Sequence, residues 1–215
     1  MRVIVTCGPS YEPIDQVRRL TNFSTGELGL VLCAALVRAG HEVICLKGDG
    51  ATSRVDPAGA ELVLFSTNDD LLQKIHGLTG RADVDAVFHA AALCDYRVNS
   101  VRAVNGTPLT AAKLPTRDGN LSLSLEPAAK VLPQMRGLFP NAQIVGWKFE
   151  LDGSRNDALA KARLQIAGCR TDACVVNGTA WGAGFGFVEP GCEVAAVADK
   201  PALCAFLAQW LGQRA

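Results

Sequence analysis

Short apolar runs rich in β-branched residues alternate along this chain with segments of helical periodicity, and this alternation is the strongest constraint on its fold. Strands are predicted at residues 2–6, 42–47, 61–65, 86–91, 143–149, 172–177 and 193–198. Helices are predicted at about residues 24–39, 68–78, 128–138, 156–167 and 201–211. Because consecutive parallel strands need long crossovers, the pattern indicates a three-layer α/β protein: a Rossmann-like, mostly parallel sheet with helices on both faces.

One segment, residues 97–126, interrupts the alternation. It is polar, carries Gly-Thr-Pro and Asp-Gly turn signals at residues 106–108 and 118–119, and ends in the alternating run LSLSL. This texture predicts a small β-ribbon, or flap, that leaves the sheet. The chain has 215 residues, of which 49% are hydrophobic, enough for one full core. We therefore predict a single domain over residues 1–215, with the ribbon as an excursion.

The composition argues against several classes of protein. The 21 basic and 21 acidic residues balance, so no electrostatic footprint for nucleic acid or an anionic membrane is visible. The chain starts directly in a strand, and no apolar run approaches the length of a membrane span. The eight cysteines lack C-x-x-C spacing, which favours free, buried thiols over disulfides or a metal site. A cytoplasmic protein without nucleic-acid or membrane partners is expected.

The connection between the first strand and the first helix, residues 7–29, is dense in groups that can hold an anion. Arg18, Arg19 and Asn22 precede residues 24–27, which have the spacing of a capping box. A helix that starts after a strand offers free backbone N–H groups and a positive dipole end to a ligand. Capping is nevertheless the commoner role of a serine such as Ser24. Both interpretations use the same residues.

A second strand end should meet this connection at the same edge of the sheet, because the carboxyl ends of parallel strands share one edge. Ala91 and Ala92 are small enough to let a ligand approach the backbone, and Asp95 offers a carboxylate for a magnesium ion or a ribose hydroxyl. The alternative is an ordinary buried strand with an aspartate that caps the next turn.

The run GPSYEPIDQVRRLTNFSTGELG, residues 8–29, resembles the first motif of the phosphopantothenoylcysteine synthetases, GGT-x-E-P-I-D-x-V-R-x-I-x-N-x-S-S-G-K-x-G. The segment HAAALCDY, residues 89–96, is similar to their second motif, AAV-x-DY. Two departures stand in the first motif. Pro9-Ser10 replaces its second Gly and its Thr, and Glu27 stands where the family usually has Lys or Arg.

Later segments follow in the family's order. Lys113 resembles the family's lysine before the ribbon, although a lone lysine on a polar loop is usually a solvated charge. Residues 146–150 match a G-F-x-x-E or F-K-x-E strand end, and residues 160–177 resemble A-x-K-L-x-x-K-x-x-D-x-I-V-x-N without its second lysine. Residues 182–186 resemble the family's G-x-G-F-G turn, which lies beside the base of the nucleotide. That turn leads into a strand and is not a dinucleotide fingerprint.

The resemblance implies a role for each matching residue. Asn22 and Arg18 would face the carboxyl group and the intermediate, and Lys113 would steady the charge that develops during activation. The substrate would lie against Ser24, Thr25, Gly26, Ala91 and Ala92. The nucleotide would contact Gly8, Ser10, Asp95, Lys148, Phe149, Lys161, Asn177 and Phe185. Asp95 would also be the metal ligand.

The activity implied by the resemblance is a ligation in coenzyme A biosynthesis. The carboxylate of 4′-phosphopantothenate would attack the α-phosphorus of CTP or ATP with the help of Mg²⁺, and cysteine would displace the nucleotide. No flavin is expected. A homodimer is expected, with the synthetase standing alone and any phosphopantothenoylcysteine decarboxylase being a separate protein.

Two other functions stay open at this point. A nicotinamide-dependent oxidoreductase on the same architecture is disfavoured, because the first strand-to-helix turn lacks G-x-G-x-x-G. A catalytically silent paralogue that binds phosphopantothenate or nucleotide is favoured by Glu27 and Pro9-Ser10. A carboxylate in the first helical turn would also repel a phosphate docked there. We therefore expect Glu27 to turn away from the phosphate, a basic residue from elsewhere, such as a dimer partner, to replace the motif's cation, and Glu27→Lys to tighten substrate binding.

Overall fold

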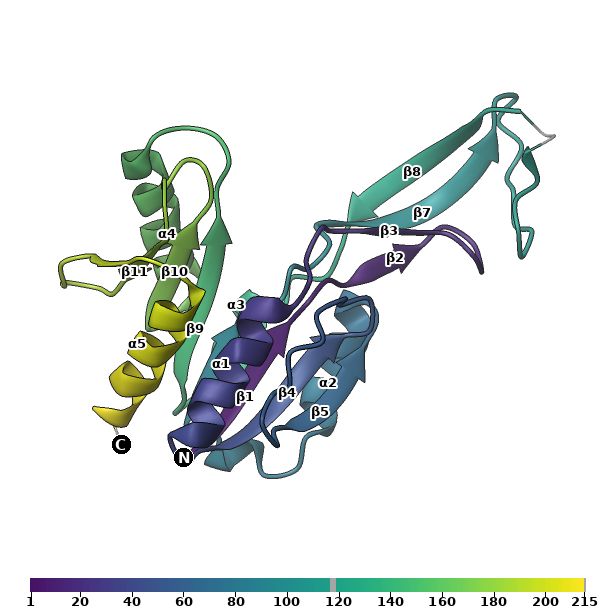
Figure 1. Ribbon diagram of the computed structural model, residues 1–215. Coiled ribbons are helices and arrows are strands. Elements are labelled where there is room, and N and C mark those ends of the chain that lie inside the picture. Colours follow the sequence, from purple (N-terminus) through teal and green to yellow (C-terminus); the bar gives the residue numbers. More distant parts are fainter. Residues whose placement is uncertain (117–118, 215) are drawn as a thin grey trace.

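The computed structural model describes residues 1–116 and 119–214 and is built on one eight-stranded sheet (Figure 1). The strand order is β12-β11-β10-β9-β6-β1-β4-β5. The six parallel strands are β1 (Arg2–Cys7), β4 (Glu42–Gly48), β5 (Glu61–Phe65), β6 (Ala86–His89), β9 (Gln143–Phe149) and β10 (Ala173–Asn177). At one edge, β11 (Phe185–Val188) pairs antiparallel with β10 and with β12 (Ala195–Val197). The predicted mostly parallel sheet is confirmed.

Helices cover both faces of the sheet. On one face lie α1 (Glu27–Arg38) and α5 (Lys200–Gly212), whose apolar side chains join one buried cluster with Val3, Phe88 and Val175. On the other face lie α2 (Asn68–Gly77), α3 (Leu132–Leu138) and α4 (Arg155–Cys169). Alternate residues of each strand serve the two layers, as the pleat of a sheet requires. The three-layer prediction is therefore confirmed.

Two predicted helix starts are wrong, and both differences shape the ligand-binding edge. Helix α1 begins at Glu27, after Gly26 in the left-handed conformation (φ 76°), and the Thr25 hydroxyl accepts a hydrogen bond from Glu27 N–H (3.3 Å). Ser24 therefore lies too far before the helix to form the predicted capping box. Helix α3 begins at Leu132 and not at 128, because Ala128 N–H still bonds to Asp95 O beside the end of the ribbon (2.9 Å).

The predicted excursion is present as an antiparallel ribbon of β7 (Tyr96–Ala103) and β8 (Leu121–Pro127). A second hairpin, β2 (Tyr11–Pro13) with β3 (Arg19–Thr21), lies beside it, and both project away from the sheet (Figure 1). The sequence did not predict this hairpin, because its strands are too short and polar to show alternation. Asp118 of the predicted Asp-Gly turn lies outside the described residues. The one-domain assignment over residues 1–215 stays a prediction.

Two sequence expectations concern membranes and thiols. Within the described residues, no helix combines the length and apolar character that a membrane crossing needs. All eight cysteines are free thiols, as predicted. Six are buried, whereas Cys169 is half-buried and Cys192 is exposed. The expectation of buried thiols is therefore correct except at these two positions.

Gly29 lets α1 lie directly on β1, and Gly29→Ala is expected to destabilise the protein. A Cβ atom at Gly29 would lie 2.2 Å from the Cβ of Cys7. Overpacking of this kind costs about 1–3 kcal/mol, which outweighs the roughly 1 kcal/mol that alanine gains over glycine in a helix. Urea unfolding measures the difference. Gly137→Ala in α3 is the matched control and should not destabilise, since its new methyl group would have no described atom within 4 Å apart from its chain neighbours and its own helix backbone.

Candidate functional site

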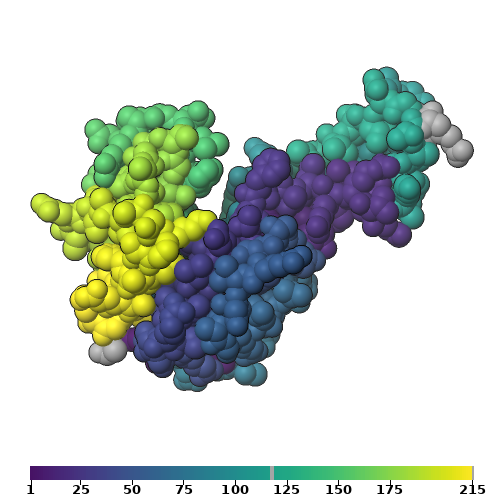
Figure 2. Space-filling model, in the orientation of Figure 1, coloured from purple at the N-terminus to yellow at the C-terminus, as the bar shows by residue number. Residues whose placement is uncertain are grey.

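The sheet places the site at the point where its strand order reverses. From β1 the chain continues to β4 and β5 on one side, whereas β6, β9 and β10 follow on the other side. Ligands of open α/β sheets bind in the crevice at such a switch point, beyond the carboxyl ends of the strands. A cavity of about 870 Å³ lies there (Figure 2). In Figure 2 it opens between the purple N-terminal part and the green and yellow C-terminal part of the chain.

The cavity gathers most of the residues that the sequence predicted. They come from the loops that follow β1, β3 and β6, from the ends of β9 and β10, and from the start of β11, and the outermost two, Gly8 and Phe185, are 177 positions apart in the chain. The predicted residues that line the cavity are Gly8, Asn22, Ser24, Thr25, Gly26, Ala91, Ala92, Asp95, Lys148, Phe149, Asn177 and Phe185. The fold thus brings five separate sequence motifs to one cavity.

Beside α1, the cavity wall includes the backbone of two glycines, Gly8 and Gly26. Gly8 and Gly26 both have positive φ, at 78° and 76°. A Cβ atom on Gly8 would lie 2.8 Å from the Cβ of Ala51, and one on Gly26 would lie 3.3 Å from the Cα of Gly8. These two glycines allow the loops to pack closely. The start of α1 faces the cavity beside them, and the backbone N–H groups of its first turn suit an anionic ligand.

Asn22 ties two walls of the cavity together. Its Nδ2 group donates hydrogen bonds to the carbonyl oxygens of Ala92 (3.2 Å) and Leu93 (2.9 Å). The loop before α1 is thereby fixed against the loop after β6. This contact gives Asn22 a defined position on the cavity wall, where its amide oxygen remains available as an acceptor.

Asp95 lies at the mouth of the cavity and forms an ion pair with Lys130. Within residues 1–116 and 119–214, no group of three or more His, Cys, Asp or Glu side chains is placed to hold a metal ion. A single exposed carboxylate fits a magnesium ion that arrives with a nucleotide and keeps most of its ligands from phosphates and water. It does not fit a permanently bound metal.

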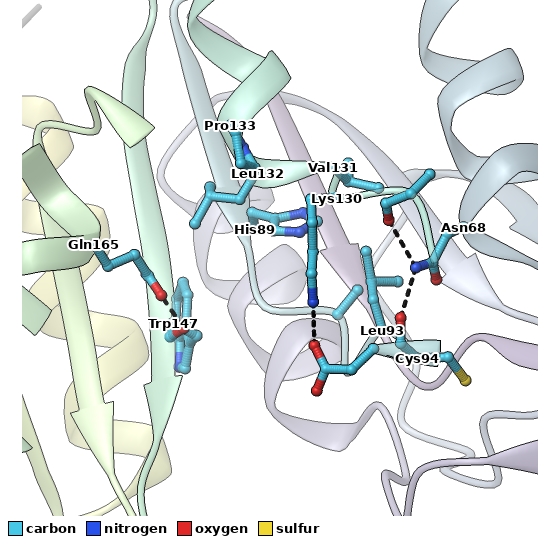
Figure 3. Close-up of a pocket in the computed structure, with 13 residues that line it drawn as sticks. Asn68, His89, Leu93, Cys94, Lys130, Val131, Leu132, Pro133, Trp147 and Gln165 are labelled. Carbon is cyan, nitrogen blue, oxygen red and sulfur yellow. Dashed lines mark hydrogen bonds and ion pairs between the residues drawn. The ribbon is translucent and has the colours of Figure 1, made fainter. Parts of the chain in front are cut away.

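A smaller cavity of about 190 Å³ adjoins the larger one and shares five lining residues with it, among them Asp95 and Trp147 (Figure 3). Its wall carries the buried side chain of His89, whose Nδ1 atom lies 2.8 Å from Thr6 Oγ1. Burial lowers the pKa of His89 to about 4, so the imidazole is neutral at pH 7. The ring is thus a hydrogen-bonding group and not a cation in this chamber.

Two predicted catalytic residues lie outside both cavities, on the projecting hairpins. Arg18 pairs with the fully buried carboxylate of Asp15 (3.2 Å) and donates to Leu114 O (2.8 Å). Lys113 is the residue before Leu114, and its side chain is exposed. The hairpin and the segment around Lys113 are therefore held together, and neither Arg18 nor Lys113 lines a cavity.

Two predicted nucleotide contacts are engaged elsewhere. Ser10 is fully buried, and its hydroxyl accepts a hydrogen bond from Cys94 N–H (2.8 Å). Lys161 forms an ion pair with Glu150, and this hydrogen bond raises the pKa of Lys161. Neither residue lines the two cavities, so their nucleotide contacts stay predictions without support from the geometry.

Other cavity residues were not singled out from the sequence. They are Phe23, Leu28, Trp147, Leu151, Gln165 and Lys200. Trp147 lies inside the motif at residues 146–150, next to the predicted residues Lys148 and Phe149, so the sequence could have predicted it as a site residue. Lys200 had no such signal. It reaches the cavity only because α5 packs beside α1, where Lys200 forms an ion pair with Glu27.

Comparisons with known proteins agree with this architecture. Residues 1–202 match the model of the family described as "DNA/pantothenate metabolism flavoprotein C-terminal domain". The chain is 33% identical over 193 residues to the coenzyme A biosynthesis bifunctional protein CoaBC of Mycobacterium bovis, covering 86% of this chain and 43% of that protein. It is 30% identical over 179 residues to CoaBC of Thermococcus kodakarensis, covering 82% and 41%.

A solved structure shows the same fold over the whole chain. The DNA/pantothenate metabolism flavoprotein from Streptococcus pneumoniae superposes with a TM-score of 0.88 at 23% identity and covers 100% of both chains. The chain spans only 41–43% of the two CoaBC proteins named above, so their activities are not transferred by similarity alone. Because the family match extends over residues 1–202, the chain belongs to the DNA/pantothenate metabolism flavoprotein C-terminal domain family, and the resemblance to the phosphopantothenoylcysteine synthetases is confirmed.

Proposed function

We propose that this chain is a phosphopantothenate–cysteine ligase that acts in coenzyme A biosynthesis. The observation that carries the proposal is the 870 Å³ cavity, which unites five motifs resembling those of the synthetases at the switch point of the sheet. The family membership and the CoaBC relatives support the same assignment.

The reaction would proceed in two displacements. The carboxylate of 4′-phosphopantothenate attacks the α-phosphorus of CTP or ATP, and pyrophosphate leaves. The amine of cysteine then attacks the acyl carbon of this acyl-nucleotidylate, loses a proton, and displaces the nucleoside monophosphate. Both steps depend on positioning and on stabilisation of phosphoryl charge, which the protein supplies, with magnesium entering on the triphosphate.

The cavity provides a place for each reactant. The substrate phosphate would lie against Ser24, Thr25 and the open start of α1, whose N–H groups favour an anion. The nucleotide would lie along the ends of β9 and β10, against Lys148, Phe149, Asn177 and Phe185, with Asp95 near its magnesium ion. Asn22, which also lines the cavity, would bind the reacting carboxyl group.

We also propose that the active form is a homodimer. Leu121, Leu123 and Leu125 of β8 are 38%, 38% and 45% exposed, which leaves an apolar face on the projecting ribbon. Lys113 and Arg18 do not line the cavity of their own chain. A second copy that packs on the ribbons would cover the leucines and bring Lys113 to the cavity of its partner.

A catalytically silent paralogue is the second candidate, and Glu27 is the observation that favours it. The side chain of Glu27 lines the cavity, so it places a carboxylate next to the proposed phosphate site. Such a protein would bind phosphopantothenate without turnover. A cytoplasmic location and a separate decarboxylase partner stay predictions.

Pyrophosphate release tests the proposal directly. Release is expected to require phosphopantothenate, Mg²⁺ and either CTP or ATP, and cysteine should then complete the turnover. Assays with each nucleotide, with and without cysteine, measure both steps and the nucleotide preference. Binding of phosphopantothenate without condensation under any nucleotide or divalent ion would select the silent paralogue.

A further inference from the structure

Glu27 and Lys200 form an ion pair at the wall of the larger cavity, although they are 173 positions apart in the chain. Each is the first residue of its helix, Glu27 of α1 and Lys200 of α5. Asp199 fixes the start of α5, because its Oδ1 accepts a hydrogen bond from Ala202 N–H at 2.8 Å. The cap fixes the start of α5, and the ion pair places the ammonium group of Lys200 beside the start of α1.

This ion pair is open to the cavity. The side chains of Lys200 and Glu27 are 44% and 43% exposed. Exposed ion pairs contribute little to stability, so the ammonium group can turn to a new anion at small cost. Lys200 is thus both neutralising Glu27 and available to a ligand.

The cavity has one other lysine on its wall among the residues that the structure describes, Lys148. Trp147 packs into the core under α1 and α5, so Lys148, the next residue of β9, points to the opposite face of the sheet. There it lies 3.5 Å from Glu150. The two ammonium groups therefore lie at different parts of the cavity wall. Lys200 lies beside the start of α1, and Lys148 lies at the end of β9, on the other face of the sheet.

We propose that Lys200 binds the phosphate group of the pantetheine-type substrate, in place of the basic residue that Glu27 has displaced from the first motif. This inference rests on the proposed function, which requires two separate anions, a substrate phosphate and a nucleotide triphosphate. Lys200 binds the substrate phosphate beside Ser24 and Thr25, and Lys148 binds the nucleotide triphosphate. An ammonium ion is well suited to a phosphate as a point charge.

Calorimetric titration with 4′-phosphopantothenate and with pantothenate, which lacks the phosphate, tests the inference. Lys200→Met is expected to weaken phosphopantothenate binding about tenfold or more, the effect of losing a charge-assisted contact. Pantothenate binding should not change. The double variant Glu27→Lys/Lys200→Met moves the cation back to position 27 and should restore binding close to the wild-type level. Lys74→Met, on α2 and paired with Asp70, is the matched control and should bind as wild type does.

The outcomes separate this inference from the proposed function. Unchanged phosphopantothenate affinity in Lys200→Met, with the wild type binding normally, would overturn the role of Lys200 alone. Weak binding by both the single and the double variant would also overturn it, because a misplaced α5 and not a missing charge would then be the cause. If the wild-type protein binds no phosphopantothenate, the proposed function fails and this inference fails with it.

Discussion

Lys113→Ala is expected to lower kcat by about 100- to 1000-fold while the free energy of unfolding barely changes. A cation that meets the developing phosphoryl charge acts mainly in the transition state, and loss of one such group typically has an effect of this size. Lys113 is exposed and lies on a polar segment, so its removal disturbs no core packing. Single-turnover kinetics measures the chemical step, and urea unfolding measures the stability. A wild-type kcat would show that Lys113 is an ordinary surface lysine.

The same variant tests whether Lys113 acts across a dimer. Asn22→Ala should also be inactive, because Asn22 lies on the cavity wall and links it to Ala92 and Leu93. In a mixed dimer of Lys113→Ala and Asn22→Ala, one cavity keeps its own Asn22 and receives an intact Lys113 from the other protomer. Mixing the two variants should therefore restore activity. If Lys113 acts on its own chain, the mixture stays inactive.

The stability of the protein should fall by about 3 kcal/mol between pH 6.5 and pH 4, because of His89. Burial lowers its pKa from 6.5 to about 4 in the folded protein. The unfolded chain therefore takes up a proton below pH 6.5, whereas the folded chain does so only near pH 4. Protons favour unfolding across this window, at 1.36 kcal/mol for each pKa unit. His41, whose pKa burial also lowers, adds to the effect in the same direction.

Urea unfolding at a series of pH values measures this dependence. His89→Asn keeps a group that can bond with Thr6 Oγ1 but removes the titration, so its stability should vary much less between pH 6.5 and 4.5. Carboxylates such as Asp70, whose pKa is lowered, lose their contribution at more acidic pH, which leaves the upper window to the histidines. If the stability of His89→Asn fell with pH as steeply as that of the wild type, a group other than His89 would be responsible for the pH dependence.

Much of the fold could be predicted from the sequence, because buried parallel strands and amphipathic helices leave local patterns. The run at residues 61–65 is strand β5 with the predicted limits, and the helix expected after Thr67 begins there. The errors lie where tertiary contacts decide. Residues 128–131 have a helical pattern but follow the end of the ribbon, and Gly26 starts α1 by its backbone conformation and not by the side chain of Ser24.

The site was predictable to the extent that its residues lie in motifs. Gly8, Asn22, Asp95 and Asn177 are far apart in the sequence, yet each follows or ends a strand or precedes a helix, so one sheet edge collects them. Ser10 shows where this logic stops. It follows β1 in the motif, but its hydroxyl is turned into the protein, against Cys94 N–H. No local pattern distinguishes a loop side chain that faces the ligand from one that faces the core.

The sequence by itself determined the layer architecture, the ribbon and the motif residues around the cavity, because these depend on local periodicity and on the shared direction of parallel strands. Tertiary structure alone decided which charges meet. Glu27 conflicted with a phosphate at the start of α1. The cations nearby in the sequence, Arg18 and Arg19, pair with Asp15 and Asp49 instead. Packing of α5 against α1 supplies Lys200 at that point. Electrostatic contacts depend on distance in space, and the distance between residues 27 and 200 is fixed only when the two helices share one face of the sheet.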